Sequence, residues 1–136
     1  EAGGGEGAPS FLHMTTKVPG NSPIDRDISE QWNPPITLFN YTQVGQLDMV
    51  WTGSLLGIII RHDGGTEGKN IYFAEFMPDG NRIGDGAIKV NTPGTSNLNP
   101  SLTYMQNEMQ QYYLFAWLQS LIDHSQVNIA TYGCNN

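Results

Sequence analysis

The chain has 136 residues, of which 38% are hydrophobic and 14% are charged, and its formal net charge at pH 7 is -7. This acidic balance argues against a nucleic-acid-binding surface, because Lys and Arg side chains are needed to displace the counterions of a phosphate backbone. No apolar run approaches the roughly 18 residues of a membrane-spanning helix. The length suits one domain, and the 16 Gly and 8 Pro residues favour an all-β domain with many turns.

The N-terminal stretch EAGGGEGAPS is rich in Gly, so we expect residues 1–10 to be flexible and residues 11–136 to form the domain. The chain starts at Glu1 rather than Met, which indicates processing or trimming and is compatible with secretion. Asn40 begins an N-glycosylation sequon, Asn-Tyr-Thr, which supports an extracellular location. Cys134 is the single cysteine; it is either an idle exposed thiol or one half of an interchain bridge.

Short apolar alternations bounded by turn residues predict β strands along the whole chain. The segment 104–118 contains Met and Gln and could be argued as a helix, but its counterpart at 38–52 contains Gly45 and β-branched residues, so we predict strands in both. In chain order, the predicted strands are 11–18, 34–39, 46–52, 70–77, 86–91, 100–105, 111–118 and 126–132.

The apolar run LLGIII at 55–60 and the polar residues that follow it interrupt this series. One interpretation is an elongated strand that is buried in the core. The other is an apolar patch that a monomer exposes and that only a neighbouring subunit covers. The sequence leaves both interpretations open.

An internal repeat with an offset of 66 residues relates the stretch from Gln31 to the stretch from Asn97. We place the repeat units at about 33–91 and 99–132. The motif Lys-Val occurs near the end of the first unit and again in the strand 11–18, so this strand is a fourth strand without a unit of its own. Six positions are identical at this offset: Asn33 and Asn99, Pro34 and Pro100, Thr37 and Thr103, Trp51 and Trp117, Ser54 and Ser120, Leu55 and Leu121.

The motifs Asn-Pro, apolar-Trp, Ile-Tyr and Asp-Gly resemble bacterial extracellular β-propeller repeats over residues 11–132. Two units per chain are also similar to the small propeller lectins that oligomerise. The resemblance implies an all-β fold of two four-stranded propeller-like blades, circularly permuted and completed by oligomerisation. It further implies a non-catalytic, extracellular, carbohydrate-binding module, although the sequence lacks the aromatic-Arg-Glu signature of the fucose-type lectins.

The two tryptophans at equivalent repeat positions either wedge between blades as core residues or form platforms on which a sugar stacks. A His-Asp neighbourhood follows each of them and consists either of polar loop residues or of a metal-ligand pair or general base. Adjacent residues of a strand point to opposite faces, which argues against a working pair. The candidate ligand-binding residues are Trp51, Trp117, Arg61, His62, Asp63, Asp123 and His124.

The turn DGNRIGDG at 79–86 partly matches a calcium-binding loop, with Asp79, Asn81 and Asp85 as oxygen donors. The bidentate Glu of such a loop is absent, and a hairpin turn that needs Gly at positive φ explains the same residues. We therefore expect no cofactor, with calcium as the alternative.

Two other functions remain open. The second unit ends with three strands and an open edge, which the strand 11–18 fills in its own chain or in a neighbouring one. Strand exchange would then make the chain a homo-oligomeric structural subunit of a ring or a filament. A glycosidase would need two carboxylates, for which Glu75 and Asp48 are the candidates.

Overall fold

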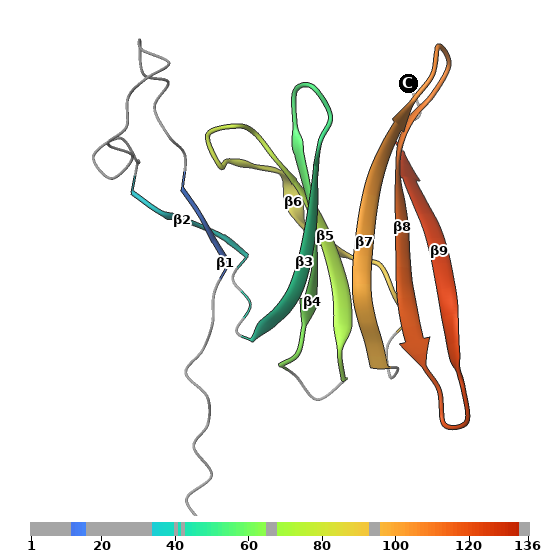
Figure 1. Ribbon diagram of the computed structural model, residues 1–136. Coiled ribbons are helices and arrows are strands. Elements are labelled where there is room, and N and C mark those ends of the chain that lie inside the picture. Colours follow the sequence, from blue (N-terminus) through green and yellow to red (C-terminus); the bar gives the residue numbers. More distant parts are fainter. Residues whose placement is uncertain are drawn as a thin grey trace, which may run out of the picture.

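The computed structural model describes residues 12–15, 34–39, 41, 43–64, 68–92 and 96–133. In this part the chain forms strands and no helix, which confirms the all-β class (Figure 1). The predictions for residues 1–10, Asn40 and Cys134 lie outside the described residues. The strands are β1 (Leu12–Met14), β2 (Ile36–Phe39), β3 (Val44–Trp51), β4 (Leu56–His62), β5 (Asn70–Phe76), β6 (Arg82–Lys89), β7 (Ser96–Gln106), β8 (Gln111–Ser120) and β9 (Ser125–Gly133).

The strands form three antiparallel sheets, with the strand orders β1-β2, β3-β4-β5-β6 and β7-β8-β9. In every sheet the strands lie side by side in the order in which they occur in the chain, so each strand pairs with the strand that precedes or follows it. Figure 1 shows the sheets as successive layers, with the four-stranded sheet in the middle. Three of the hairpins close through short loops of the same kind, at 52–55, 107–110 and 121–124, in which the first residue donates a backbone hydrogen bond to the last.

Within the middle sheet, the interior strand β4 is buried on both faces. Ile58, Ile59 and Ile60 are at most 1% exposed. Because successive side chains of a strand point to opposite faces, Ile59 packs towards β7-β8-β9 whereas Ile58 and Ile60 pack towards β1-β2. The run LLGIII is therefore a buried strand, and its interpretation as an exposed apolar patch is wrong.

Two hydrophobic clusters join the three layers. Aromatic rings dominate both of them: the centroids of Phe73 and Phe115 lie 4.8 Å apart in one cluster, and those of Phe39 and Phe76 lie 5.6 Å apart in the other. Full burial of one such side chain stabilises the fold by about 1.5–3 kcal/mol. The buried residues between the middle sheet and β7-β8-β9 are Ile59, Ile71, Phe73, Leu102, Tyr113, Phe115 and Trp117; those on the β1-β2 side are Leu38, Phe39, Ile58, Ile60, Ala74 and Phe76.

The membership of the middle sheet differs from the prediction for the first unit. The segment 34–39 was expected to be the first strand of this unit, but β2 pairs with β1 instead, with His13 opposite Thr37. The fourth strand of this sheet is instead β4, which contains most of the run LLGIII that interrupts the series of predicted strands. The physical reason is burial: Leu38 and Phe39 of β2 pack with Ile58 and Ile60 on the face of the middle sheet and so form a separate layer.

The two stretches that align at an offset of 66 residues do not occupy equivalent places in their sheets. Trp51 ends β3, an edge strand, whereas Trp117 lies in β8, the central strand of its sheet. Among the described strands, β9 pairs with β8 alone, and β1 pairs with β2. The described pairing thus places no strand from the N-terminal part beside β9.

Candidate functional site

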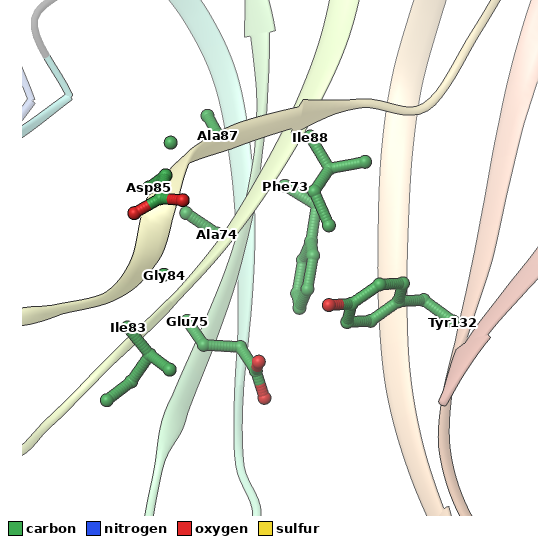
Figure 2. Close-up of a pocket in the computed structure, with 10 residues that line it drawn as sticks. Phe73, Ala74, Glu75, Ile83, Gly84, Asp85, Ala87, Ile88 and Tyr132 are labelled. Atoms are coloured by element: carbon green, nitrogen blue, oxygen red, sulfur yellow. The ribbon is translucent and has the colours of Figure 1, made fainter. Parts of the chain in front are cut away.

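A cleft opens between the middle sheet and β9. Its volume is about 460 Å³, and its walls include Phe73, Glu75, Ile88 and Tyr132 (Figure 2). A second cavity of about 100 Å³ shares Glu75 and Tyr132 with the first and extends to the loop 52–55. Both spaces are therefore lined by these two side chains, and we call the two together the Glu75 cleft.

The aromatic walls of the cleft come from the register of β7-β8-β9. Tyr104 on β7 is the cross-strand partner of Tyr113 on β8, and Tyr113 is the partner of Tyr132 on β9. One tyrosine from each strand therefore stands in a single row across the sheet. Opposite this row, Phe73 and Glu75 lie two residues apart on β5, which puts both side chains on the same face.

The row holds the Glu75 carboxylate in place. The Tyr113 hydroxyl donates a hydrogen bond of 2.9 Å to Glu75 Oε1. The ring centroid of Phe73 lies 4.8 Å from that of Tyr113 and 5.6 Å from that of Tyr132, and the Tyr104 centroid lies 5.4 Å from that of Tyr113. Glu75 is half-buried, and the hydrogen bond from Tyr113 engages one of its two carboxylate oxygens. The carboxylate is thus held at a fixed place in the wall of the cleft.

Gly57 makes room for this arrangement. It lies on β4 directly opposite Glu75. A Cβ atom at this position would stand 2.6 Å from Cε1 of Tyr113, so only glycine lets the ring approach the strand so closely. The lone glycine within an apolar strand is a signal of such an approach that is visible in the sequence.

The other wall of the cleft is a bulge in β6. Phe73 is paired with Ile88 and Glu75 with Ile83, so residues 84–87 stand opposite Ala74 alone. Gly84 has a φ of +77°, a conformation that favours glycine. Asp85 lies on this bulge, and Figure 2 shows it apart from the group formed by Phe73, Glu75 and Tyr132. This wall of the cleft is therefore formed by residues 83–88, with the side chains of Ile83 and Ile88 at its two ends.

The cleft combines aromatic rings, a tyrosine hydroxyl and a carboxylate. Aromatic rings pack on apolar C–H surfaces. A carboxylate accepts strong, charge-assisted hydrogen bonds from ligand hydroxyl or amine groups. A concave, largely apolar space with a few fixed polar groups is typical of small-ligand sites.

The two predicted tryptophans lie in different environments. Trp117 is 9% exposed, and its Nε1 donates a hydrogen bond of 3.0 Å to Oδ1 of Asn97. Asn97 in turn donates to the backbone oxygen of Lys69 at 2.9 Å, which links two sheets. Trp117 thus has the position that the packing interpretation expects, whereas Trp51 is 52% exposed at the end of β3.

Arg61 and Asp63 belong to a polar network between the sheets. The guanidinium of Arg61 donates to both carboxylate oxygens of Asp63, at 2.5 and 2.6 Å, and to Gln46 Oε1 at 2.6 Å. Gln46 then forms two hydrogen bonds with Asn99 of β7, at 2.7 and 2.8 Å. This network positions β3 and β4 against β7, which is a structural task.

The predicted histidines lie elsewhere. His62 packs against the ring of Tyr41, whose centroid is 4.9 Å away, and Tyr41 stacks near Tyr72 at 4.6 Å. Burial, followed by the proximity of Tyr72, raises the pKa of Tyr41. His124 contacts Asp123 in the exposed loop 121–124, with 2.5 Å between Nδ1 and Oδ1. The structure therefore does not gather the predicted ligand residues into one site.

The suggested calcium donors are also dispersed. Both carboxylate oxygens of Asp79 accept hydrogen bonds from Asn81, at 3.0 and 2.8 Å, and Gly80 between them has a φ of +91°. These are the contacts of a hairpin turn, and Asp85 lies beyond them on the β6 bulge. Within the described ranges, no three His, Cys, Asp or Glu side chains gather as metal ligands would.

The two nominated carboxylates have different surroundings. Glu75 lies in the cleft, as described above. Asp48 Oδ2 accepts a hydrogen bond of 2.9 Å from the backbone N–H of Leu102 and one of 3.2 Å from the Ser101 hydroxyl. Asp48 is thus engaged in holding β3 against β7.

The tyrosine row was not predicted from the sequence. Its members are far apart along the chain, and the available signal was only their inward position in three alternating strands. Glu75 was nominated, but for catalysis together with Asp48.

The described residues contain no helix that could span a membrane. Comparisons of the chain with family models, with curated proteins and with solved structures found no match.

Proposed function

We propose that the chain is a non-catalytic binding module that takes a carbohydrate in the Glu75 cleft. The observation that carries this proposal is the 2.9 Å hydrogen bond that fixes the Glu75 carboxylate among the rings of Phe73, Tyr113 and Tyr132. A sugar offers what such a cleft recognises, namely C–H faces for aromatic rings and hydroxyl groups for a carboxylate.

The proposed fold assignment is a propeller-like stack of blades. Face-to-face packing of β3-β4-β5-β6 against β7-β8-β9 supports it, because blades are four-stranded antiparallel sheets that pack side by side. In this proposal the middle sheet is one complete blade and the last sheet is three strands of the next. The extracellular location predicted from the sequence belongs to the same proposal.

A glycan array with the wild-type chain tests the ligand class, and calorimetry on the best glycan tests the site. Glu75→Gln should weaken binding at least about tenfold, because a neutral amide replaces a charge-assisted acceptor. Trp51→Ala changes an exposed aromatic residue outside the cleft and is the matched control, which should bind as the wild type does. Binding that depends on Trp51 and not on Glu75 would mean that the site is misplaced; an array without any bound glycan would mean that the ligand class is wrong.

The same glycan should be recovered intact after prolonged incubation with the protein. Cleavage that Glu75→Gln abolishes would instead favour the glycosidase alternative. Asp48→Asn should leave both binding and the recovered product unchanged, because Asp48 contacts backbone and Ser101 rather than the cleft.

A further inference from the structure

The side of β7-β8-β9 that faces away from the middle sheet is apolar and uncovered in the described structure. We call it the outer face. Figure 1 shows this sheet at the end of the stack. Val127, Ile129 and Met105 on this face are 66%, 67% and 45% exposed. Its members are Thr103, Met105, Tyr112, Leu114, Ala116, Leu118, Val127, Ile129 and Thr131.

Cross-strand pairing makes this surface continuous. Ala116 on β8 is paired with Ile129 on β9, and Leu118 is paired with Val127. Leu114 lies between Thr103 on one side and Thr131 on the other. Side chains that lie directly opposite each other on neighbouring strands are close enough to be in contact. The outer face is therefore one apolar surface across three strands and not a set of isolated residues.

The outer face also carries no charge. The strands β7, β8 and β9 contain no Asp, Glu, Lys or Arg, whereas the whole chain has a net charge of -7. Two copies of such an acidic protein repel each other at most orientations. An uncharged face is where they can approach without placing like charges opposite one another.

The chain itself shows how an equivalent face is covered. The hairpins β3–β4 and β7–β8 turn through the matching loops 52–55 and 107–110. Ile59 and Leu114 are at equivalent positions in the second strands of these hairpins. Ile59 lies three residues after Leu56, where β4 begins, and Leu114 lies three residues after Gln111, where β8 begins. Ile59 is buried because β7-β8-β9 packs on its side of the sheet. Leu114 points to the corresponding side of its own sheet, where the described structure has no further layer.

We propose that the outer face is an interface between two copies of this chain, packed outer face to outer face about a two-fold axis. A two-fold interface requires one self-complementary surface, and the outer face is an uncovered apolar surface three strands wide in the described part of the chain. The far side of β1-β2 is polar, with a 3.2 Å hydrogen bond between His13 and Thr37. The interface would again pack sheet on sheet, but between two like faces, whereas the layers within the chain are joined by unlike faces.

This interface differs from strand exchange. Strand exchange joins backbone groups at the open edge of β9, whereas the proposed dimer buries side chains on the face of the sheet. The Glu75 cleft lies on the opposite side of the same sheet; Tyr112 also lines its smaller cavity, but Val127 and Ile129 line neither part of the cleft. Loss of the dimer and loss of glycan binding are therefore separate results.

Sedimentation velocity over a range of micromolar concentrations tests the proposal. The wild type should form a dimer and no larger species. Val127→Lys and Ile129→Lys should each raise the dissociation constant at least about a hundredfold, because the two-fold axis brings two buried like charges into one interface. Both residues are exposed in the single chain, so the variants should keep the wild-type circular dichroism and melting temperature.

Two control variants test whether the effect is specific to the outer face. Ile122→Lys changes a residue of the exposed loop 121–124. Met49→Lys changes a residue of the apolar stripe formed by Leu47, Met49 and Trp51 on the edge strand β3. Both should leave the dimer intact. A monomeric wild type, or a Val127→Lys variant that still dimerises, would overturn the proposal. A series of growing oligomers that Met49→Lys abolishes would show head-to-tail contact instead of a two-fold dimer.

A measurement without substitutions completes the test. Hydroxyl-radical footprinting of the wild type should show protection of Met105, Leu118 and Ile129 at high concentration and none after dilution. Met49 should be labelled equally at both concentrations. Equal labelling of the outer face at the two concentrations would contradict the interface even if a dimer forms.

Discussion

At the scale of the residue, two tryptophans of the same repeat motif have different tasks. Trp117 is enclosed between two sheets and donates its indole N–H to Asn97 at 3.0 Å. Trp51 stands half-exposed at the end of an edge strand. The difference arises from the face on which each side chain lies: Trp117 points into the cluster between the two sheets, whereas on β3 it is Val50, the neighbour of Trp51, that packs against this cluster.

This difference predicts unequal costs of truncation. Trp117→Ala should lower the free energy of unfolding by about 3–5 kcal/mol, because it removes a large buried side chain and leaves Asn97 without its donor. Trp51→Ala should change it by at most about 0.5 kcal/mol, as is usual for surface substitutions. Urea denaturation followed by circular dichroism measures both. Equal costs would mean that the two tryptophans share one environment.

The raised pKa of Tyr41 predicts a dependence of stability on pH. Its usual value is 10.0, and burial raises the pKa in the folded state, with Tyr72 adding to the effect. The folded state therefore holds this proton more tightly than the unfolded chain does. The stabilisation is complete below pH 10 and is lost as the pH rises through the higher folded pKa.

Urea titrations at pH values around 10, where tyrosines ionise, from about pH 9 to about pH 11, should show this loss of stability. The free energy of unfolding of the wild type should fall more steeply with pH than that of Tyr41→Phe, which keeps the ring and lacks the ionisable hydroxyl. If the two slopes coincide, the folded state does not hold the Tyr41 proton more tightly.

At the scale of the element, the hairpin β3–β4 shows how one missing side chain shapes a site. Gly57 lies opposite Glu75 across β4 and β5, and the Tyr113 ring occupies the space that a Cβ would fill. The glycine thus allows the second sheet to approach and lets Tyr113 reach the carboxylate. The bulge in β6 leaves the other wall of the cleft open.

Gly57→Ala should therefore be destabilising. The new methyl group would stand 2.6 Å from Tyr113 Cε1, and such overpacking costs about 1–3 kcal/mol. Gly86→Ala is the matched control, because nothing lies within 4 Å of a Cβ built there. Gly86→Ala should leave the melting temperature within about two degrees of the wild type, as for other surface positions. Gly57→Ala should in addition weaken ligand binding, because it displaces Tyr113 from Glu75. Equal melting temperatures for the two variants would show that the ring moves aside without strain.

At the scale of the whole molecule, the middle sheet is the shared core. Ile59 packs into the cluster with β7-β8-β9, while Ile58 and Ile60 pack into the cluster with β1-β2. Each cluster thus depends on the same strand from opposite sides. Opening either layer exposes one face of β4.

Hydrogen exchange should reflect this arrangement. The amides of β4, which has a hydrogen-bonded strand on each side and a covered surface on each face, should exchange most slowly. The amides of β9, which pairs with β8 alone among the described strands, should exchange faster when measured at a concentration that keeps the chain monomeric. Slower exchange in β9 than in β4 would contradict a core centred on the middle sheet.

The sequence by itself determined the strands and the class of the fold. Alternation of apolar and polar residues predicted segments that match β3, β5, β8 and β9 closely, because side chains on the two faces of a strand meet different surroundings whatever the topology. A turn was predicted at 79–86; the structure has it at 77–81, where Asp79 and Gly80 favour a tight turn through local contacts, and β6 already begins at Arg82. Glu75 and Asp48 were nominated from the sequence as a pair of carboxylates, and the structure places Glu75 in the cleft and Asp48 against β7.

Only the tertiary structure decided which strands share a sheet and which residues share a site. The run of isoleucines in β4 fits a buried strand and an exposed patch equally well until a layer is placed on each side of it. Tyr104, Tyr113 and Tyr132 are distant in sequence and form a row only through the register of three strands. Register and layer packing depend on contacts between distant segments, which no local pattern contains. The same long-range contacts buried Trp117, left Trp51 exposed, and set the tyrosine row opposite Glu75.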